Sequence, residues 1–154
     1  MSNQGVATDG TSSKAGEVKI SEESKSLQGG KKLSVLIVDD DQLIQMMHVA
    51  LVKASGVDAE ILIAENGEVA VDLCRSGKSF DLILMDKHMP IMDGVRATRE
   101  LRKMGVKSMI IGVTACSMDY EVKPFIEAGL NECYQKPLDP EMTKSILAKL
   151  SKGN

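Results

Sequence analysis

The hydrophobic residues of this chain follow two alternating patterns. Short apolar runs rich in Val, Ile and Leu, typical of buried strands, are separated by stretches in which apolar residues recur every three or four positions, as on one face of a helix. The runs cover residues 33–38, 59–64, 80–86, 108–113 and 131–135. The helical spacing covers residues 43–52, 69–75, 94–104, 117–129 and 140–150. The pattern therefore predicts five strands that alternate with five helices.

Polar residues mark where several of these helices begin. Asp41 and Asp93 suit N-cap positions, because an aspartate side chain can accept hydrogen bonds from the free N–H groups of a first helical turn. Ser117 or Asp119 is expected to open the fourth helix. Pro124 follows within that helix, where it costs little in the first turn but would kink a later one.

Strands that alternate with helices form a mostly parallel sheet with helices on both faces. The predicted fold is therefore a doubly wound α/β domain. Its strand order stays open from the pattern alone, because the flavodoxin-like order 2-1-3-4-5 is one of two common choices. Residues 1–31, rich in Ser, Gly, Lys and Glu, are predicted to form a flexible tail, and residues 32–154 a single domain.

The composition narrows the classes of function. The chain has 154 residues and a net charge of −3, so it lacks the basic surface that nucleic-acid binding requires. Its three cysteines have no Cys-x-x-Cys spacing, which disfavours disulfides or structural zinc and favours a reducing compartment, the cytoplasm or the nucleus. No apolar run has the length of a membrane span. We expect neither a nucleic acid nor a membrane as a partner.

Polar side chains stand where four of the predicted strands end. Asp39 and Asp40 follow the first strand, Asp86 ends the third, Thr114 follows the fourth and Lys136 follows the fifth. Because the carboxyl ends of parallel strands share one edge of a sheet, these side chains are expected to converge. Carboxylates that lie close together repel unless a cation lies among them, and oxygen ligands with room for water are what Mg2+ prefers. The pattern predicts a Mg2+ site at this edge.

Such a set of groups suits the transfer of a phosphoryl group onto a carboxylate. A metal ion and a lysine would neutralise charge, a threonine would donate a hydrogen bond, and the central Asp86 would attack phosphorus. The product would be an acyl phosphate, which is labile, so the site would store a signal for a limited time. Taken singly, each residue has a simpler explanation, the acids as helix caps, Thr114 as a turn residue and Lys136 as an exposed lysine.

Four separate segments resemble the signature of two-component response regulator receiver domains. They are residues 35–40, 84–94, 113–115 and 136–137, and the resemblance covers residues 33–150. It implies the flavodoxin-like (βα)5 fold, with a five-stranded parallel sheet in the order 2-1-3-4-5. It also implies that Asp86 takes a phosphoryl group from a phosphohistidine, and that Thr114 and Lys136 contact this group.

The resemblance further implies how the metal ion is held. Asp40, Asp86 and the backbone carbonyl of His88 would bind Mg2+, and Asp39 would act through a water molecule. The Lys136-Pro137 peptide bond is often cis in this family.

The residues around the site are most similar to the plant type-C response regulators, which are stand-alone receivers. The similarity lies in residues 85–90, 128–133 and 136–138, and only Ser-Lys-Gly-Asn follows Leu150, so we expect no output domain. This implies uptake of phosphoryl groups from histidine phosphotransfer proteins, and hybrid histidine kinases are a second candidate partner. The protein would be a monomer that loses phosphate by hydrolysis and so drains a cytokinin-type phosphorelay.

One other class of function stays open, and a further one is disfavoured. The chain could be a binding module that sequesters phosphotransfer proteins or histidine kinases, with turnover incidental. A flavodoxin-like nucleotide or flavin binder is disfavoured, because no Gly-rich phosphate loop follows the first strand.

Three residues around the site have more than one interpretation. The side chain of His88 either tunes hydrolysis of the acyl phosphate or is a solvated loop histidine whose backbone alone matters. Cys133 stands where receivers commonly carry Tyr or Phe, and Tyr134 is predicted to face the other side of the sheet, so the usual aromatic switch is in doubt. His48 is interpreted as a surface or packing residue rather than a carrier of phosphoryl groups.

The helix after the fourth strand belongs to the family's usual partner face. Met118, Tyr120, Val122 and Phe125 could supply apolar contacts there, although core packing explains some of them equally well. The exposure of these side chains distinguishes the two explanations.

Overall fold

The computed structural model describes residues 18–21 and 32–152, which form six strands and five helices. The strands are β1 (Val18–Ser21), β2 (Leu33–Val38), β3 (Ala59–Ala64), β4 (Leu82–Asp86), β5 (Met109–Thr114) and β6 (Glu132–Gln135). The helices are α1 (Gln42–Ala54), α2 (Gly67–Arg75), α3 (Gly94–Lys103), α4 (Asp119–Glu127) and α5 (Pro140–Lys152). All five predicted strands and all five predicted helices are therefore present.

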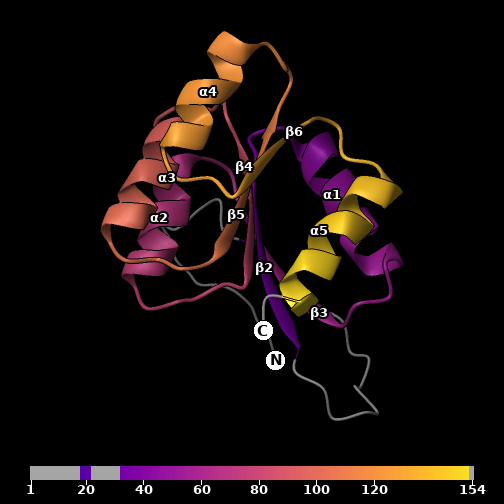
Figure 1. Ribbon diagram of the computed structural model, residues 1–154. Coiled ribbons are helices and arrows are strands. Elements are labelled where there is room, and N and C mark those ends of the chain that lie inside the picture. The colour runs from indigo at the N-terminus through magenta and orange to yellow at the C-terminus, as the bar shows by residue number, and fades with distance from the viewer. Residues whose placement is uncertain (1–17, 22–31, 153–154) are drawn as a thin grey trace.

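The strands β2 to β6 form a parallel sheet in the order β3-β2-β4-β5-β6 (Figure 1). Numbered from the first predicted strand, this order is 2-1-3-4-5, so the flavodoxin-like fold is confirmed. The central strand, β4, is buried along its whole length, from Leu82 to Asp86. The sheet therefore carries Asp86 to the middle of its carboxyl edge.

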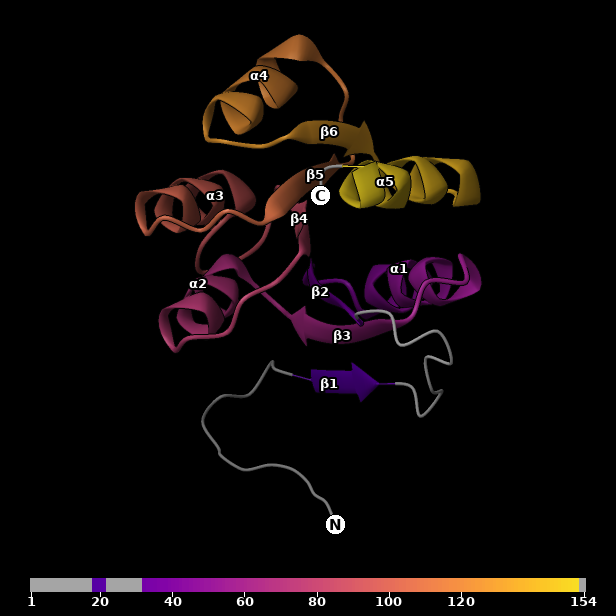
Figure 2. The same ribbon diagram turned by 60° about the horizontal axis from the view of Figure 1, so that its bottom comes forward.

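A sixth strand, β1, extends the sheet beyond the predicted five. It pairs antiparallel with β3, with Val18 opposite Ile63 and Ser21 opposite Glu60, and it forms the edge of the sheet (Figure 2). These four residues belong to the segment that was predicted to be a flexible tail. The rest of residues 1–31 lies outside the described residues. The strand escaped prediction because a run this short is defined by the neighbouring edge that it pairs with.

Helices cover both faces of the sheet (Figure 2). In β4, Ile83 and Met85 pack toward α2, α3 and α4, whereas Leu82 and Leu84 pack toward α1 and α5. Phe125 of α4 is fully buried in the first of these two cores. The apolar runs of the sequence are continuous rather than alternating because both faces of this parallel sheet are covered.

The starts of three helices can be compared with the sequence analysis. The side chains of Asp41 and Asp93 accept hydrogen bonds from N–H groups in the first turns of α1 and α3, which confirms both caps. Helix α4 begins at Asp119, one of the two expected starts, but its N-cap residue, Met118, makes no side-chain hydrogen bond. Pro124 lies in the second turn of α4, where its missing N–H leaves one helical hydrogen bond unmade.

The guanidinium of Arg102 ties α3 to the segment that leads into β6. It donates hydrogen bonds to the backbone carbonyls of Gly129 (2.9 Å), Val106 (2.8 Å) and Ser108 (2.9 Å) and to Oδ1 of Asn131 (3.0 Å). One charged group therefore donates hydrogen bonds to oxygen atoms in the segments before and after β5 along the chain. This anchor helps to hold the strand that precedes Lys136.

We expect Arg102→Met to lower the free energy of unfolding by about 3 kcal/mol, because the partly buried oxygen acceptors lose their charged donor. Urea denaturation measures the loss. The matched control is Arg99→Met, an exposed position on the same helix, which should cost less than about 0.5 kcal/mol. Equal losses for the two variants would contradict the anchoring role.

Candidate functional site

Three ionisable side chains meet at the carboxyl end of the sheet. Asp39 directly follows β2, Asp86 is the last residue of β4, and Lys136 directly follows β6. Strand alternation, continued through these positions, turns all three toward the face covered by α1 and α5. Asp39 and Asp86 are almost fully buried, with 1% and 4% of their surfaces exposed. The strand ends therefore converge as the sequence predicts.

The ammonium of Lys136 bridges the two aspartates. Its Nζ is 3.2 Å from Oδ2 of Asp39 and 3.0 Å from Oδ1 of Asp86. Burial, together with the negative charge of Asp39, raises the pKa of Asp86 to about 6, and burial also raises the pKa of Asp39. Burial alone would lower the pKa of Lys136, but its hydrogen bond to Asp86 raises it. One cation thus faces two buried carboxylates, and the cluster keeps excess negative charge.

A third carboxylate completes a group that can hold a cation. Carboxylate oxygens of Asp39, Asp40 and Asp86 all lie within 4.8 Å of one another. Asp40 is exposed, so the group opens to solvent on one side. Oxygen donors with access to water fit Mg2+, and a cation here would relieve the repulsion between Asp39 and Asp86. The side chains predicted to hold the metal are together, and the backbone carbonyl of His88 stays a prediction.

Thr114 ends β5, beside the strand that carries Asp86. The residue is 1% exposed, and its Oγ1 accepts a hydrogen bond of 3.3 Å from the backbone N–H of Cys116. Its contact with a phosphoryl group stays a prediction. The peptide bond between Lys136 and Pro137 is cis, as the resemblance implied.

The loop after Asp86 packs closely against the end of β4. The backbone N–H of Gly94 donates to the carbonyl of Lys87 (2.7 Å), and a Cβ at position 94 would lie 2.0 Å from the carbonyl oxygen of Asp86, so only glycine fits. Ile91 has a φ of 71° and is 70% exposed. A β-branched residue rarely adopts this left-handed conformation, so the loop stores backbone strain beside the site.

The two residues that follow Asp86 both contact helix α4. Nζ of Lys87 is 2.6 Å from Oε1 of Glu121, and Nε2 of His88 is 2.9 Å from the same atom. The hydrogen bonds from Lys87 and then His88 lower the pKa of Glu121. The pairing of Lys87 with Glu121 cannot be predicted from the sequence, because a separation of 34 residues carries no periodic signal.

His48 is buried in α1, with 2% of its surface exposed. Its Nε2 atom has no hydrogen-bond partner among the described residues. Burial, and to a smaller extent the charge of Lys136, lowers the pKa of His48 to about 4. The imidazole is therefore neutral at pH 7 and packs in the interior, in agreement with the packing interpretation.

Cys133 and Tyr134 lie on opposite faces of the sheet. Cys133 packs against the core under α2, α3 and α4, where burial raises the pKa of its thiol. Tyr134 packs against the core under α1 and α5, and its hydroxyl donates to Oε1 of Glu132 (2.7 Å). Tyr134 therefore does not replace an aromatic side chain at position 133.

The apolar residues of the α4 region divide between core and surface. Phe125 is fully buried and belongs to the core, whereas Met118 and Tyr120 are 56% and 70% exposed. Val122 is half-buried. Met118 and Tyr120 are thus the two candidates that remain for a partner surface.

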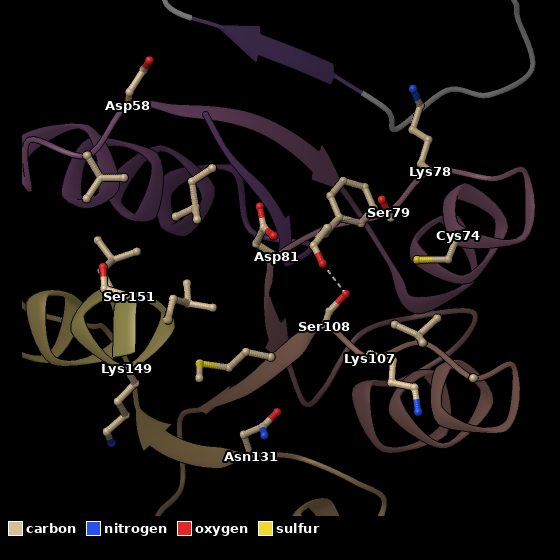
Figure 3. Close-up of a pocket in the computed structure, with 18 residues that line it drawn as sticks. Asp58, Cys74, Lys78, Ser79, Asp81, Lys107, Ser108, Asn131, Lys149 and Ser151 are labelled. Atoms are coloured by element: carbon tan, nitrogen blue, oxygen red, sulfur yellow. Dashed lines mark hydrogen bonds between the residues drawn. The ribbon is translucent and has the colours of Figure 1, made fainter. Parts of the chain in front are cut away.

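A groove of about 800 Å³ lies at the amino-terminal ends of the strands, opposite the end that carries Asp86 (Figure 3). Its lining includes Leu33 and Met109, the first residues of β2 and β5, and Asp81, which directly precedes β4. The length of a strand therefore separates this groove from Asp86. None of the predicted site residues lines it.

The family model of the response regulator receiver domain matches residues 35–148. The chain belongs to this family. As a receiver domain, it carries its strand-end acids, threonine and lysine within the matched residues.

In the described part of the chain, none of the helices has both the length and the apolar character that a membrane span requires.

Curated relatives include plant response regulators. The chain is 52% identical over 120 residues to the two-component response regulator ARR22 of Arabidopsis thaliana, covering 76% of this chain and 83% of that protein. It is 42% identical over 120 residues to the two-component response regulator ORR41 of Oryza sativa subsp. japonica, covering 77% and 94%. The similarity to plant type-C response regulators is confirmed.

Solved receiver structures have the same fold. The signal receiver domain of the putative response regulator NarL from Mycobacterium tuberculosis is 21% identical, with a TM-score of 0.71, and the match covers 81% of this chain and all (100%) of that chain. The receiver domain of sensor histidine kinase PA1611 from Pseudomonas aeruginosa PAO1 is 27% identical, with a TM-score of 0.68, over 78% and 98% of the two chains. That structure holds a magnesium ion in its active site cleft.

We expect His48 to make the receiver less stable as the pH falls from 6.5 to about 4. In this window the unfolded state binds more protons than the folded state, so the free energy of unfolding decreases, by on the order of 3 kcal/mol in total. Urea denaturation at a series of pH values measures the slope. The raised pKa values of Asp39 and Asp86 contribute the opposite slope, equally in wild type and variants.

The His48→Gln variant should lack the destabilising slope between pH 6.5 and 4. Met46→Gln is the control, because it replaces an exposed residue of the same helix that does not titrate, and it should keep the wild-type slope. A His48→Gln variant with an unchanged slope would show that His48 does not titrate in this way.

Proposed function

We propose that this receiver accepts a phosphoryl group from a phosphohistidine of a histidine phosphotransfer protein onto Asp86, and then loses it by hydrolysis. The observation that carries the proposal is the bridge of Lys136 between Asp86 and Asp39 at the carboxyl end of the sheet. With Asp40 beside it, the cluster joins a buried carboxylate to a fixed cation and a group of oxygen donors.

The transfer step is a displacement at phosphorus. A carboxylate oxygen of Asp86 forms the new P–O bond while the P–N bond to the donor imidazole breaks, and the electron pair returns to the imidazole nitrogen. Lys136 neutralises charge on the phosphoryl oxygens, and the Thr114 hydroxyl donates a hydrogen bond to them. Asp40, Asp86 and the backbone carbonyl of His88 would hold Mg2+, with Asp39 acting through water, and the ion would supply the remaining positive charge.

Hydrolysis returns the site to its starting state. Water forms a bond to phosphorus, the P–O bond to Asp86 breaks, and the electron pair returns to the carboxylate, with inorganic phosphate as the product. The side chain of His88, two residues from Asp86, influences the approach of this water. Cys133 takes the place of the usual aromatic residue, which is consistent with a protein that passes on phosphoryl groups rather than switching an output.

Apolar side chains beside the acids suit a protein as the donor. Leu43 and Met46 of α1, immediately after the acidic segment, are 66% and 68% exposed, and Ile91 in the loop after Asp86 is 70% exposed. A small phosphodonor would need no such surface, whereas a protein partner buries one. Because plant response regulators are among the relatives, we propose that the relay is of the cytokinin type and that the receiver drains it.

Incubation with a radiolabelled phosphotransfer protein and Mg2+ should label the wild-type receiver and then release labelled phosphate. Asp86→Asn should take up no label, because it lacks the attacking carboxylate. Asp72→Asn, an exposed position on α2, is the control and should behave as wild type. Label retained on Asp86→Asn at the wild-type level would contradict the proposal. An acyl phosphate that lasts for hours would favour the alternative, a binding module that sequesters its donor.

Mg2+ should raise the thermal unfolding midpoint of the unphosphorylated receiver. At about ten times its dissociation constant, the ion adds roughly 1.4 kcal/mol, a shift of about 4 °C. Asp40→Asn should reduce this shift, because it removes one metal ligand, whereas Asp72→Asn should preserve it. Comparison of unfolding in Mg2+ and in EDTA measures the effect. A full shift in Asp40→Asn would exclude that residue as a ligand.

A further inference from the structure

Glu121 links the loop after Asp86 to helix α4. One of its carboxylate oxygens, Oε1, lies 2.6 Å from the ammonium of Lys87 and 2.9 Å from Nε2 of His88. Lys87 and His88 directly follow the proposed phosphoryl acceptor, and Glu121 lies in the first turn of α4. The chemistry proposed above gives neither Lys87 nor Glu121 a role.

Lys87 depends on this contact. Its side chain is 11% exposed and that of Glu121 is 23% exposed, so water screens the pair only weakly. An ammonium this buried needs a hydrogen-bonded negative charge, and Glu121 supplies it. Because the hydrogen bonds from Lys87 and His88 lower the pKa of Glu121, the carboxylate stays ionised at neutral pH.

Strand alternation explains why Lys87 turns toward α4. Asp86 points toward the face covered by α1 and α5, so the next residue falls on the face covered by α4. The positive charge of Lys87 acts on the Cys133 thiol, where it opposes the increase in pKa caused by burial. Lys87 therefore lies close enough to Cys133 for its charge to act on the thiol.

A phosphoryl group on Asp86 would compete with Glu121 for the side chain of His88. It carries close to two negative charges and three strong acceptor oxygens, one and two residues away from Lys87 and His88 along the chain. Without the Glu121 carboxylate, the exposed side chain of His88 would be free to turn toward these oxygens. Contacts of that kind would hold the phosphoryl group and cover phosphorus against the in-line approach of water.

We propose that Glu121 is a positioning residue that shortens the lifetime of the acyl phosphate on Asp86, because it holds His88 on α4, in a contact that Lys87 shares, and away from the phosphoryl oxygens. The inference rests on the proposed function, since it requires phosphorylation of Asp86. Glu121 thereby adds a residue of α4 to the control of hydrolysis. It contacts neither the phosphorus atom nor the carboxylates that are proposed to bind the metal ion.

The test compares wild type with Glu121→Gln, which keeps the size of the side chain and removes its charge. Each protein is phosphorylated with the radiolabelled phosphotransfer protein and Mg2+, freed of the donor, and followed until the acyl phosphate is lost. We expect the half-life of the Glu121→Gln acyl phosphate to be roughly three- to tenfold longer, as for one gained charge-assisted hydrogen bond. An unchanged or shorter half-life would overturn the inference.

Two further comparisons separate positioning from a general structural effect. Glu127→Gln removes one negative charge from the exposed end of the same helix, outside the contact, and should keep the wild-type half-life. In a Lys87→Met, His88→Ala background, Glu121→Gln should have no further effect, because its two partners are gone. A longer half-life in that background would also overturn the inference, since Glu121 would then act by another route.

Beryllofluoride, which mimics the phosphoryl group in the presence of Mg2+, gives a readout that does not depend on hydrolysis. Glu121→Gln should bind it more tightly by a similar factor, and equal affinity would count against the inference. The experiments distinguish a failure of the proposed function from a failure of this inference. If wild type forms no acyl phosphate on Asp86, the proposed function fails; if it forms one whose lifetime Glu121→Gln leaves unchanged, only this inference fails.

Discussion

The bridge that Lys136 makes between Asp39 and Asp86 is the interaction on which the site depends. Its hydrogen bonds span 97 and 50 positions of the sequence, so only the completed sheet can assemble it. Without the lysine, two buried carboxylates would repel each other and oppose folding. With it, the cluster still carries excess negative charge. That remaining charge suits a divalent cation, which would offset part of the negative charge of an incoming phosphoryl group.

The sheet and the loop above it contribute in different ways. Every residue of β4 is buried, so Asp86 cannot move without disturbing the core on both faces. Gly94 lets α3 approach the same strand end more closely than any other residue would allow. The loop between them holds Ile91 in a left-handed conformation that costs on the order of 1 kcal/mol. The carboxylate of Asp86 is thus fixed by packing, while strain is confined to the exposed segment beside it.

Features that follow local rules could be predicted from the sequence. Continuous apolar runs mark strands buried on both faces, and an acid at the end of such a run must lie at the carboxyl edge, so Asp39 and Asp86 could be paired in advance. Features that need a distant neighbour could not. The contact of Lys87 with Glu121 arises only when α4 packs on the sheet, and the left-handed φ of Ile91 runs against the preference of a β-branched residue.

The antiparallel strand β1 joins the sheet under a different rule from the other strands. Parallel strands are connected by crossovers that fix their order, whereas β1 pairs with the outer edge of β3 from the amino-terminal side of the chain. It can therefore be gained or lost without rethreading any connection. If this strand were lengthened, replaced or removed, the five parallel strands and the acids at their ends would keep their order and their connections.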